Sequence, residues 1–290
     1  RHAMQCNIVS QVKPSGILGG VVTYTVAACI WSFQAAKLAL KLVISPRKFL
    51  TAVDRSFLDE QEPLPGVVHE YLCVNGIRLH AASLGRQPDK PLMLFIHGFP
   101  EFWYSWKAQL QAFSKDYDAV AIDMRGYGQS DKPSGISSYN LDLLASDVAG
   151  VVQALGHERC VLVAHDWGGF VAWVTAGMYP QVIDRLVTMA GPHLALMQVN
   201  LTLRQALRSW YMLSFQWPWI SEWAMRANDY DALGTTFTFG SQFGPRVDGA
   251  FSAVDREWYK HAFSRPGAAT ASINYYRALM RCLTYAPIPS

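Results

Sequence analysis

Short apolar runs alternate with amphipathic segments through residues 66–191 of the chain. Such runs are typical of strands that are buried on both faces of a parallel sheet, and they lie at 91–97, 117–123, 160–164 and 185–190. Helical patterns cover 140–155, with Asn140 at the N-cap position, and 170–178. Two alternating runs, 69–74 and 77–82, flank Asn75-Gly76, which is a strong signal for a hairpin. This order predicts an α/β fold, with a mostly parallel sheet flanked by helices.

The pattern changes at Gly191-Pro192. From there to residue 287 it becomes helical and rich in aromatic residues. We therefore predict that residues 66–191 form the first part of an α/β core and that residues 192–287 form a helical lid over it. The tryptophans of this segment are expected to pack in its core and line a pocket.

The N-terminal segment, residues 1–45, has a different pattern. No charged residue lies between Lys13 and Lys37, and the stretch 16–40 is long enough to cross a hydrocarbon core of roughly 30 Å. We expect a single membrane anchor here, with a cleaved signal peptide or an amphipathic surface helix as alternatives. Basic residues after the stretch outnumber those before it, which predicts a catalytic domain in the cytosol. The charged, proline-containing segment 46–65 is expected to be a linker.

Composition narrows the functional classes. With 51% hydrophobic and 16% charged residues among 290, the chain can bury a large core, and disorder is excluded. A net charge of +3 without a basic cluster argues against nucleic-acid binding. The five cysteines are scattered, which favours free thiols and indicates no metal site. We expect no metal and no cofactor.

The strongest chemical signal is the turn Ala164-His165-Asp166-Trp167-Gly168, which joins a buried strand to a helix. A nucleophile flanked by small residues at such a turn is typical of the α/β-hydrolase elbow. Here the nucleophile is Asp166, which is already ionised near neutral pH and would form an ester with an electrophilic carbon. The alternative role for Asp166 is that of a helix cap only.

A second loop lies after the run 91–97. In this architecture it supplies one backbone N–H of an oxyanion hole, and the residue after the nucleophile supplies the other. These positions fall on Phe99 and Trp167, which would also contact substrate. His97 is expected to tether the loop rather than to act in catalysis.

The chain resembles the α/β-hydrolase epoxide hydrolases, in particular their membrane-anchored branch. The resemblance rests on three motifs in order: residues 97–101, Asp123 with residues 125–131, and residues 165–169. It implies an aspartate nucleophile at Asp166, a lid tyrosine that protonates the epoxide oxygen, and a single-pass protein of the endoplasmic reticulum membrane that acts in lipid metabolism.

The family's lid tyrosine lies in an Asn-aromatic-Tyr-Arg pattern, which places it at Tyr276; Tyr275 is the fallback donor. By the same resemblance a second tyrosine falls near residues 211–216, where Ser214 occupies its place and Tyr211 could compensate. Tyr211 and Tyr275 are expected to contact substrate.

The catalytic acid and histidine of such a hydrolase follow the nucleophile. We assign this role to neither His193 nor His261, the two histidines after Asp166. The expectation is that the last core strands are absent and that this chain lacks the groups for ester hydrolysis.

The resulting hypothesis is an epoxide hydrolase that opens lipophilic epoxides to vicinal diols with water. A dehalogenase or other hydrolase of this fold is the first alternative, and a non-catalytic, membrane-tethered, truncated product is the second.

Overall fold

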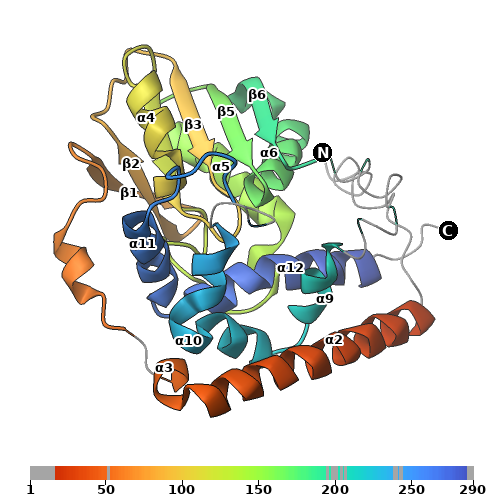
Figure 1. The fold of residues 1–290 in the computed structure, drawn as a ribbon. Helices are drawn as coiled ribbons and strands as arrows, with labels where there is room; N and C mark the ends of the chain where they lie inside the picture. Colours follow the sequence, from red (N-terminus) through yellow and green to blue (C-terminus); the bar gives the residue numbers. More distant parts are fainter. Residues whose placement is uncertain are drawn as a thin grey trace.

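The computed structural model describes residues 17–50, 53–193, 208–237 and 244–285, together with the single residues 196, 202, 205 and 241. Its centre is a six-stranded sheet in the order β1-β2-β4-β3-β5-β6 (Figure 1). The strands are β1 Val68–Val74, β2 Ile77–Ser83, β3 Leu92–Ile96, β4 Asp118–Ile122, β5 Cys160–His165 and β6 Ile183–Met189. Strands β3 to β6 are parallel, and β2 runs antiparallel to both β1 and β4. The predicted mixed, mostly parallel sheet is confirmed.

The β1–β2 hairpin closes at the predicted dipeptide. Val74 pairs with Ile77, and Asn75 and Gly76 both have positive φ, 51° and 74°. Two central residues with positive φ give a turn whose twist matches that of the flanking strands.

The two faces of the sheet bury two separate hydrophobic clusters. Along β3, Leu92, Leu94 and Ile96 join the cluster that contains α5 (Leu141–Ala154) and α6 (Trp167–Met178). Met93 and Phe95 point the opposite way, into a cluster with Leu110 of α4 (Lys107–Phe113). This alternation is that of a strand buried on both faces, and it explains why the run lacks charged residues.

The helices after β6 lie beyond the carboxyl ends of the parallel strands (Figure 1). They are α9 Trp210–Ser214, α10 Ile220–Thr236, α11 Ala253–Ser264 and α12 Ala268–Tyr285. Helices thus make up most of the described part of this segment, as predicted, with a break in α10 at residues 227–230. Their position places side chains of α9 and α12 opposite the loops that follow β3 and β5.

The predicted anchor segment is helical, but among the described residues no helix is long and apolar enough to cross a membrane. Helix α2 (Ile17–Ile44) carries Gln34 and Lys37, which lower its mean hydropathy. It runs along the outer side of α9 and α10 (Figure 1), where the buried Trp31 donates its indole N–H to the Ser214 carbonyl oxygen at 2.8 Å. A spanning segment at 16–40 is thus not supported, and the endoplasmic reticulum location stays a prediction.

The segment predicted as a linker packs against α10 and α11. Arg55 is only 3% exposed, and its guanidinium donates to both carboxylate oxygens of Asp229, at 2.7 and 2.6 Å. It also donates to Glu257 at 2.8 Å. A buried arginine forked onto a carboxylate holds this segment in a fixed position.

Candidate active site

Asp166 stands at the turn between β5 and α6. Its backbone has φ 49° and ψ −115°, a conformation that costs free energy in a residue with a side chain. The turn is tight, because a Cβ atom on Gly168 would lie 2.5 Å from the Ile96 carbonyl oxygen. A glycine is therefore required at Gly168 for α6 to begin so close to β3. The turn directs the Asp166 carboxylate away from the sheet, toward the loop after β3.

Two backbone N–H groups meet at this carboxylate. The Phe99 N–H donates to Asp166 Oδ1 at 2.9 Å, and the Trp167 N–H also bonds to the Asp166 side chain. Burial raises the pKa of Asp166, and the two N–H donors only partly offset that effect. The structure thus brings together Asp166, Phe99 and Trp167, the three residues that the sequence places at the nucleophile and the oxyanion hole.

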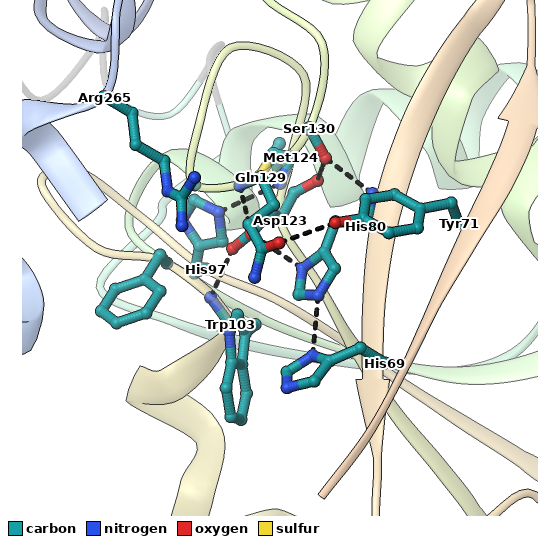
Figure 2. Close-up of polar contacts among 12 residues, drawn as sticks. His69, Tyr71, His80, His97, Trp103, Asp123, Met124, Gln129, Ser130 and Arg265 are labelled. Atoms are coloured by element: carbon teal, nitrogen blue, oxygen red, sulfur yellow. Dashed lines mark hydrogen bonds and ion pairs between the residues drawn. The ribbon is translucent and has the colours of Figure 1, made fainter. Parts of the chain in front are cut away.

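The loop that carries Phe99 is held by His97 (Figure 2). The buried His97 ring bonds through Nδ1 to the Gly98 carbonyl oxygen at 2.8 Å, and its Nε2 accepts from the Met124 N–H at 3.1 Å. Because a backbone N–H can only donate, Nε2 carries no proton and Nδ1 is the donor. Both nitrogens are therefore occupied, which agrees with a tethering role for His97.

A buried polar network surrounds Asp123 at the end of β4 (Figure 2). Its carboxylate accepts from the Trp103 N–H at 2.9 Å and the Gln129 N–H at 2.9 Å, and bonds to His80 Nδ1 at 2.8 Å. Burial opposes ionisation, but His80 and these donors together hold the pKa of Asp123 well below its usual range. The network ties the residues that follow the Phe99 loop to β2.

Glu101 and His165 form a pair beside Asp166 that the sequence reasoning missed. Glu101 Oε2 accepts from the Gly98 N–H at 2.9 Å and bonds to His165 Nδ1 at 3.0 Å. The hydrogen bond to Glu101 raises the pKa of His165; Glu101 is buried, yet its bonds to His165 and Gly98 lower its pKa overall. The sequence carried a signal for this pair: His165 directly precedes Asp166, and Glu101 lies two residues after Phe99 in the loop that follows β3.

A cavity of about 440 Å³ opens above Asp166. Its wall is mostly apolar, and the side chains that line it include Trp167, Phe170, Leu196, Met212 and Leu279. Such a site, with a few polar groups in an apolar wall, is suited to a lipophilic small molecule.

Two tyrosines line the same cavity as Asp166. Tyr276 of α12 packs edge-on against Trp167, with ring centroids 4.8 Å apart, and burial raises its pKa well above 10. Tyr211 of α9 packs edge-on against Tyr276, with ring centroids 5.8 Å apart. The cavity therefore brings together the carboxylate of Asp166 and two phenols.

One expectation for the tyrosines is corrected. Tyr275 does not line the cavity; it is buried and donates its hydroxyl to the Arg125 carbonyl oxygen at 2.6 Å, so it is placed neither as a substrate contact nor as the fallback donor. Ser214 is also buried, and its hydroxyl donates to the Tyr211 carbonyl oxygen at 2.7 Å. The second phenol of the cavity is that of Tyr211, the residue expected to compensate for Ser214.

Neither histidine after Asp166 lines the cavity above its carboxylate. His261 Nε2 bonds to Asp59 at 3.1 Å, and the ring of His193 packs against that of Trp173 at 5.5 Å. These contacts agree with assigning neither histidine as the catalytic base.

Comparison with known proteins defines the family. Residues 91–220 match the model of the α/β hydrolase fold. Over 72% of the chain, the sequence is 41% identical to mouse epoxide hydrolase 4, of which the match covers 58%. It is 40% identical to the AB hydrolase superfamily protein YfhM of Bacillus subtilis over 75% of each chain.

Solved structures give the same result. A Bacillus megaterium epoxide hydrolase in complex with an inhibitor matches with a TM-score of 0.61 and 33% identity, over 72% of this chain and 71% of that one. The Vigna radiata epoxide hydrolase VrEH1 matches with a TM-score of 0.63 and 31% identity, over 77% and 74%. The protein therefore belongs to the epoxide hydrolase family of the α/β-hydrolase fold.

Proposed function

We propose that this chain opens lipophilic epoxides through an ester on Asp166. The observation that carries the proposal is the shared cavity, in which the Asp166 carboxylate and the phenols of Tyr276 and Tyr211 line one mostly apolar space. An epoxide needs both kinds of group, because ring opening requires a nucleophile at carbon and a proton donor at oxygen.

In the first step an Asp166 carboxylate oxygen attacks one epoxide carbon. A carbon–oxygen ester bond forms, the ring carbon–oxygen bond breaks, and its electron pair moves to the former ring oxygen. Tyr276 donates its phenolic proton to that oxygen while Tyr211 donates a hydrogen bond, and the resulting phenolate regains a proton from water. The Tyr276 phenol is protonated at neutral pH, as an ordinary tyrosine is, and because burial raises its pKa further, it gives up its proton only to a strong base such as the alkoxide formed on ring opening.

In the second step water cleaves the ester and releases the diol. The carbonyl oxygen of the ester becomes an oxyanion, which the Phe99 and Trp167 N–H groups would stabilise from positions where they already bond Asp166. This step also needs a base for the attacking water, and we assign no residue of this chain to it. The chain spans 58% of mouse epoxide hydrolase 4, so complete turnover is proposed for the whole protein rather than for this stretch.

The test is covalent capture, read by intact mass after an acid quench. A terminal aryl epoxide such as styrene oxide is expected to add its full mass to the chain, since ring opening expels no leaving group. Asp166→Ala should abolish the adduct, and peptide mapping should place it on Asp166 in the unaltered chain. An adduct of equal yield in Asp166→Ala would refute the assignment.

Tyr276→Phe separates the epoxide reaction from halide displacement, which uses the same ester chemistry. Loss of the phenolic proton donor should slow capture of the epoxide by about 10²-fold or more. Capture of a matched alkyl bromide, whose leaving group needs no proton, should be unchanged. An equal loss with both probes would contradict the proposed role of Tyr276, and efficient capture of the bromide alone would indicate a dehalogenase.

A further inference from the structure

The residue that follows Tyr276, Arg277, forms a buried junction between three helices. Arg277 is 6% exposed, and its side chain lies among the end of α9, the start of α10 and its own helix, α12. Tyr276 and Arg277 are neighbours in sequence, so a shift of the α12 backbone at Arg277 is shared by the backbone that carries the Tyr276 phenol.

The guanidinium holds the end of α9 through backbone carbonyl groups. Arg277 Nε donates to the Phe215 carbonyl oxygen at 2.9 Å, and Nη2 donates to that of Trp217 at 3.1 Å. Helix α9 has only five residues, too few to be stable without such partners. Since α9 carries Tyr211, these bonds connect the backbone beneath one cavity phenol to the helix that carries the other.

The charge of Arg277 is matched by Glu222 in the first turn of α10. Nη1 donates to Oε1 of Glu222 at 2.6 Å and Nη2 to Oε2 at 3.1 Å, which is a two-pronged contact. Glu222 is only 9% exposed, so the pair is shielded from water. A fork of this kind fixes direction as well as distance, which a lysine ammonium cannot do.

We propose that Arg277, oriented by Glu222, is a positioning residue that sets the Tyr211 phenol against that of Tyr276. This inference rests on the proposed function, in which both phenols address one epoxide oxygen. The edge-on contact between the rings of Tyr211 and Tyr276, with centroids 5.8 Å apart, and the packing of the Phe215 ring on Tyr276, at 5.0 Å, are the contacts through which a displaced α9 would act.

The test is a double-mutant cycle on the rate of epoxide capture at saturating styrene oxide. Arg277→Lys keeps the charge but cannot make all of the guanidinium's bonds, so we expect a rate loss of about 10- to 100-fold, as for a misplaced catalytic group. The epoxide concentration that gives half the maximal rate should stay unchanged. In a Tyr211→Phe background the same substitution should have almost no further effect, because the group that it positions is already gone.

Two further variants complete the experiment. Glu222→Gln removes one of the two carboxylate acceptors of Arg277 with little change in shape. Its loss of capture rate should likewise disappear in a Tyr211→Phe background, and this holds as a test even if Arg277→Lys does not fold. Arg55→Lys is the matched control, because Arg55 is also buried and forked onto a carboxylate of α10, Asp229, but has no bond to α9 or α12 among the described residues. It should lower thermal stability and leave the capture rate at the wild-type value.

Each outcome is decisive. Rate losses of Arg277→Lys and Tyr211→Phe that multiply in the double variant would overturn the inference, since they would mean independent effects. An equal rate loss in Arg55→Lys would also overturn it, by showing that any buried arginine variant slows capture. If the unaltered chain captures no epoxide, the proposed function itself fails, and this inference falls with it.

Discussion

Gly98→Ala tests whether the loop after β3 positions the nucleophile. A Cβ atom at Gly98 would lie 2.5 Å from Asp166 Cβ and 2.8 Å from Oδ1. An ordinary contact is at least 3.4 Å, so the loop and the Asp166 side chain must separate by about 0.9 Å. The Phe99 N–H moves with the loop, and its 2.9 Å bond to Oδ1 would lengthen beyond hydrogen-bonding range.

A displacement of about 1 Å at a reacting group costs on the order of 10²-fold in rate. We therefore expect Gly98→Ala to slow epoxide capture by about 10²-fold. Steric overpacking should also lower its free energy of unfolding by about 1–3 kcal/mol.

The assay compares this variant with Gly156→Ala. Gly156 has φ +87° and nothing within 4 Å of its added Cβ, so alanine there strains the backbone by about 1 kcal/mol without touching the site. Both variants should unfold at lower temperature, but only Gly98→Ala should lose the capture rate, measured by quench and intact mass. A folded Gly98→Ala protein that captures epoxide at the wild-type rate would refute the role assigned to this loop.

Two further predictions concern pH. Capture requires the Asp166 carboxylate, and burial raises its pKa, so the rate should fall on acidification with a midpoint above 3.8; a midpoint at or below 3.8 would contradict the burial effect. Glu101→Gln keeps an acceptor for the Gly98 N–H but removes the charge that raises the pKa of His165. Because the pKa of His165 is raised in the folded state, its charge stabilises the fold below pH 6.5, and this contribution is lost as pH rises through the folded-state pKa. Glu101→Gln should therefore lower the melting temperature more at pH 5.5 than at pH 8.5. Equal losses at both values would indicate that the His165 charge does not contribute.

The sheet and the elbow could be predicted because their signals are local. Each parallel strand is a short, mostly apolar run, and the predicted ends differ from the observed ends by no more than one residue at β3, β4 and β5. Parallel strands also end at one edge of a sheet, so the loops that carry Phe99 and Asp166 had to be neighbours once β3 and β5 were adjacent. That rule explains why the Phe99 N–H meets the Asp166 carboxylate, a pair that the hydrolase architecture predicted.

The N-terminal segments were harder to predict, because hydropathy does not report tertiary contacts. The apolar stretch at 16–40 suggested an anchor, yet the indole of Trp31 is buried against Ser214. The charges of 46–65 suggested a solvated linker, yet Arg55 lies buried between Asp229 and Glu257. In both segments the residue that binds the buried side chain lies about 170 or more positions away in the sequence, so no local pattern could indicate the contact.

Three consecutive residues of α12 show which side-chain positions a sequence motif can predict and which it cannot. Successive side chains on a helix point about 100° apart, so Tyr275, Tyr276 and Arg277 cannot share one environment. The Tyr275 hydroxyl reaches the Arg125 carbonyl oxygen in the core, the Tyr276 phenol lines the cavity, and the Arg277 guanidinium reaches Glu222 and the end of α9. The family pattern identified Tyr276 but left Tyr275 and Tyr211 undecided, because the facing of each helix depends on what packs around it. One turn of α12 therefore connects the sheet core, the reacting groups and the helix that carries the second phenol, so a change at Arg277 should act on chemistry through geometry rather than through its own charge.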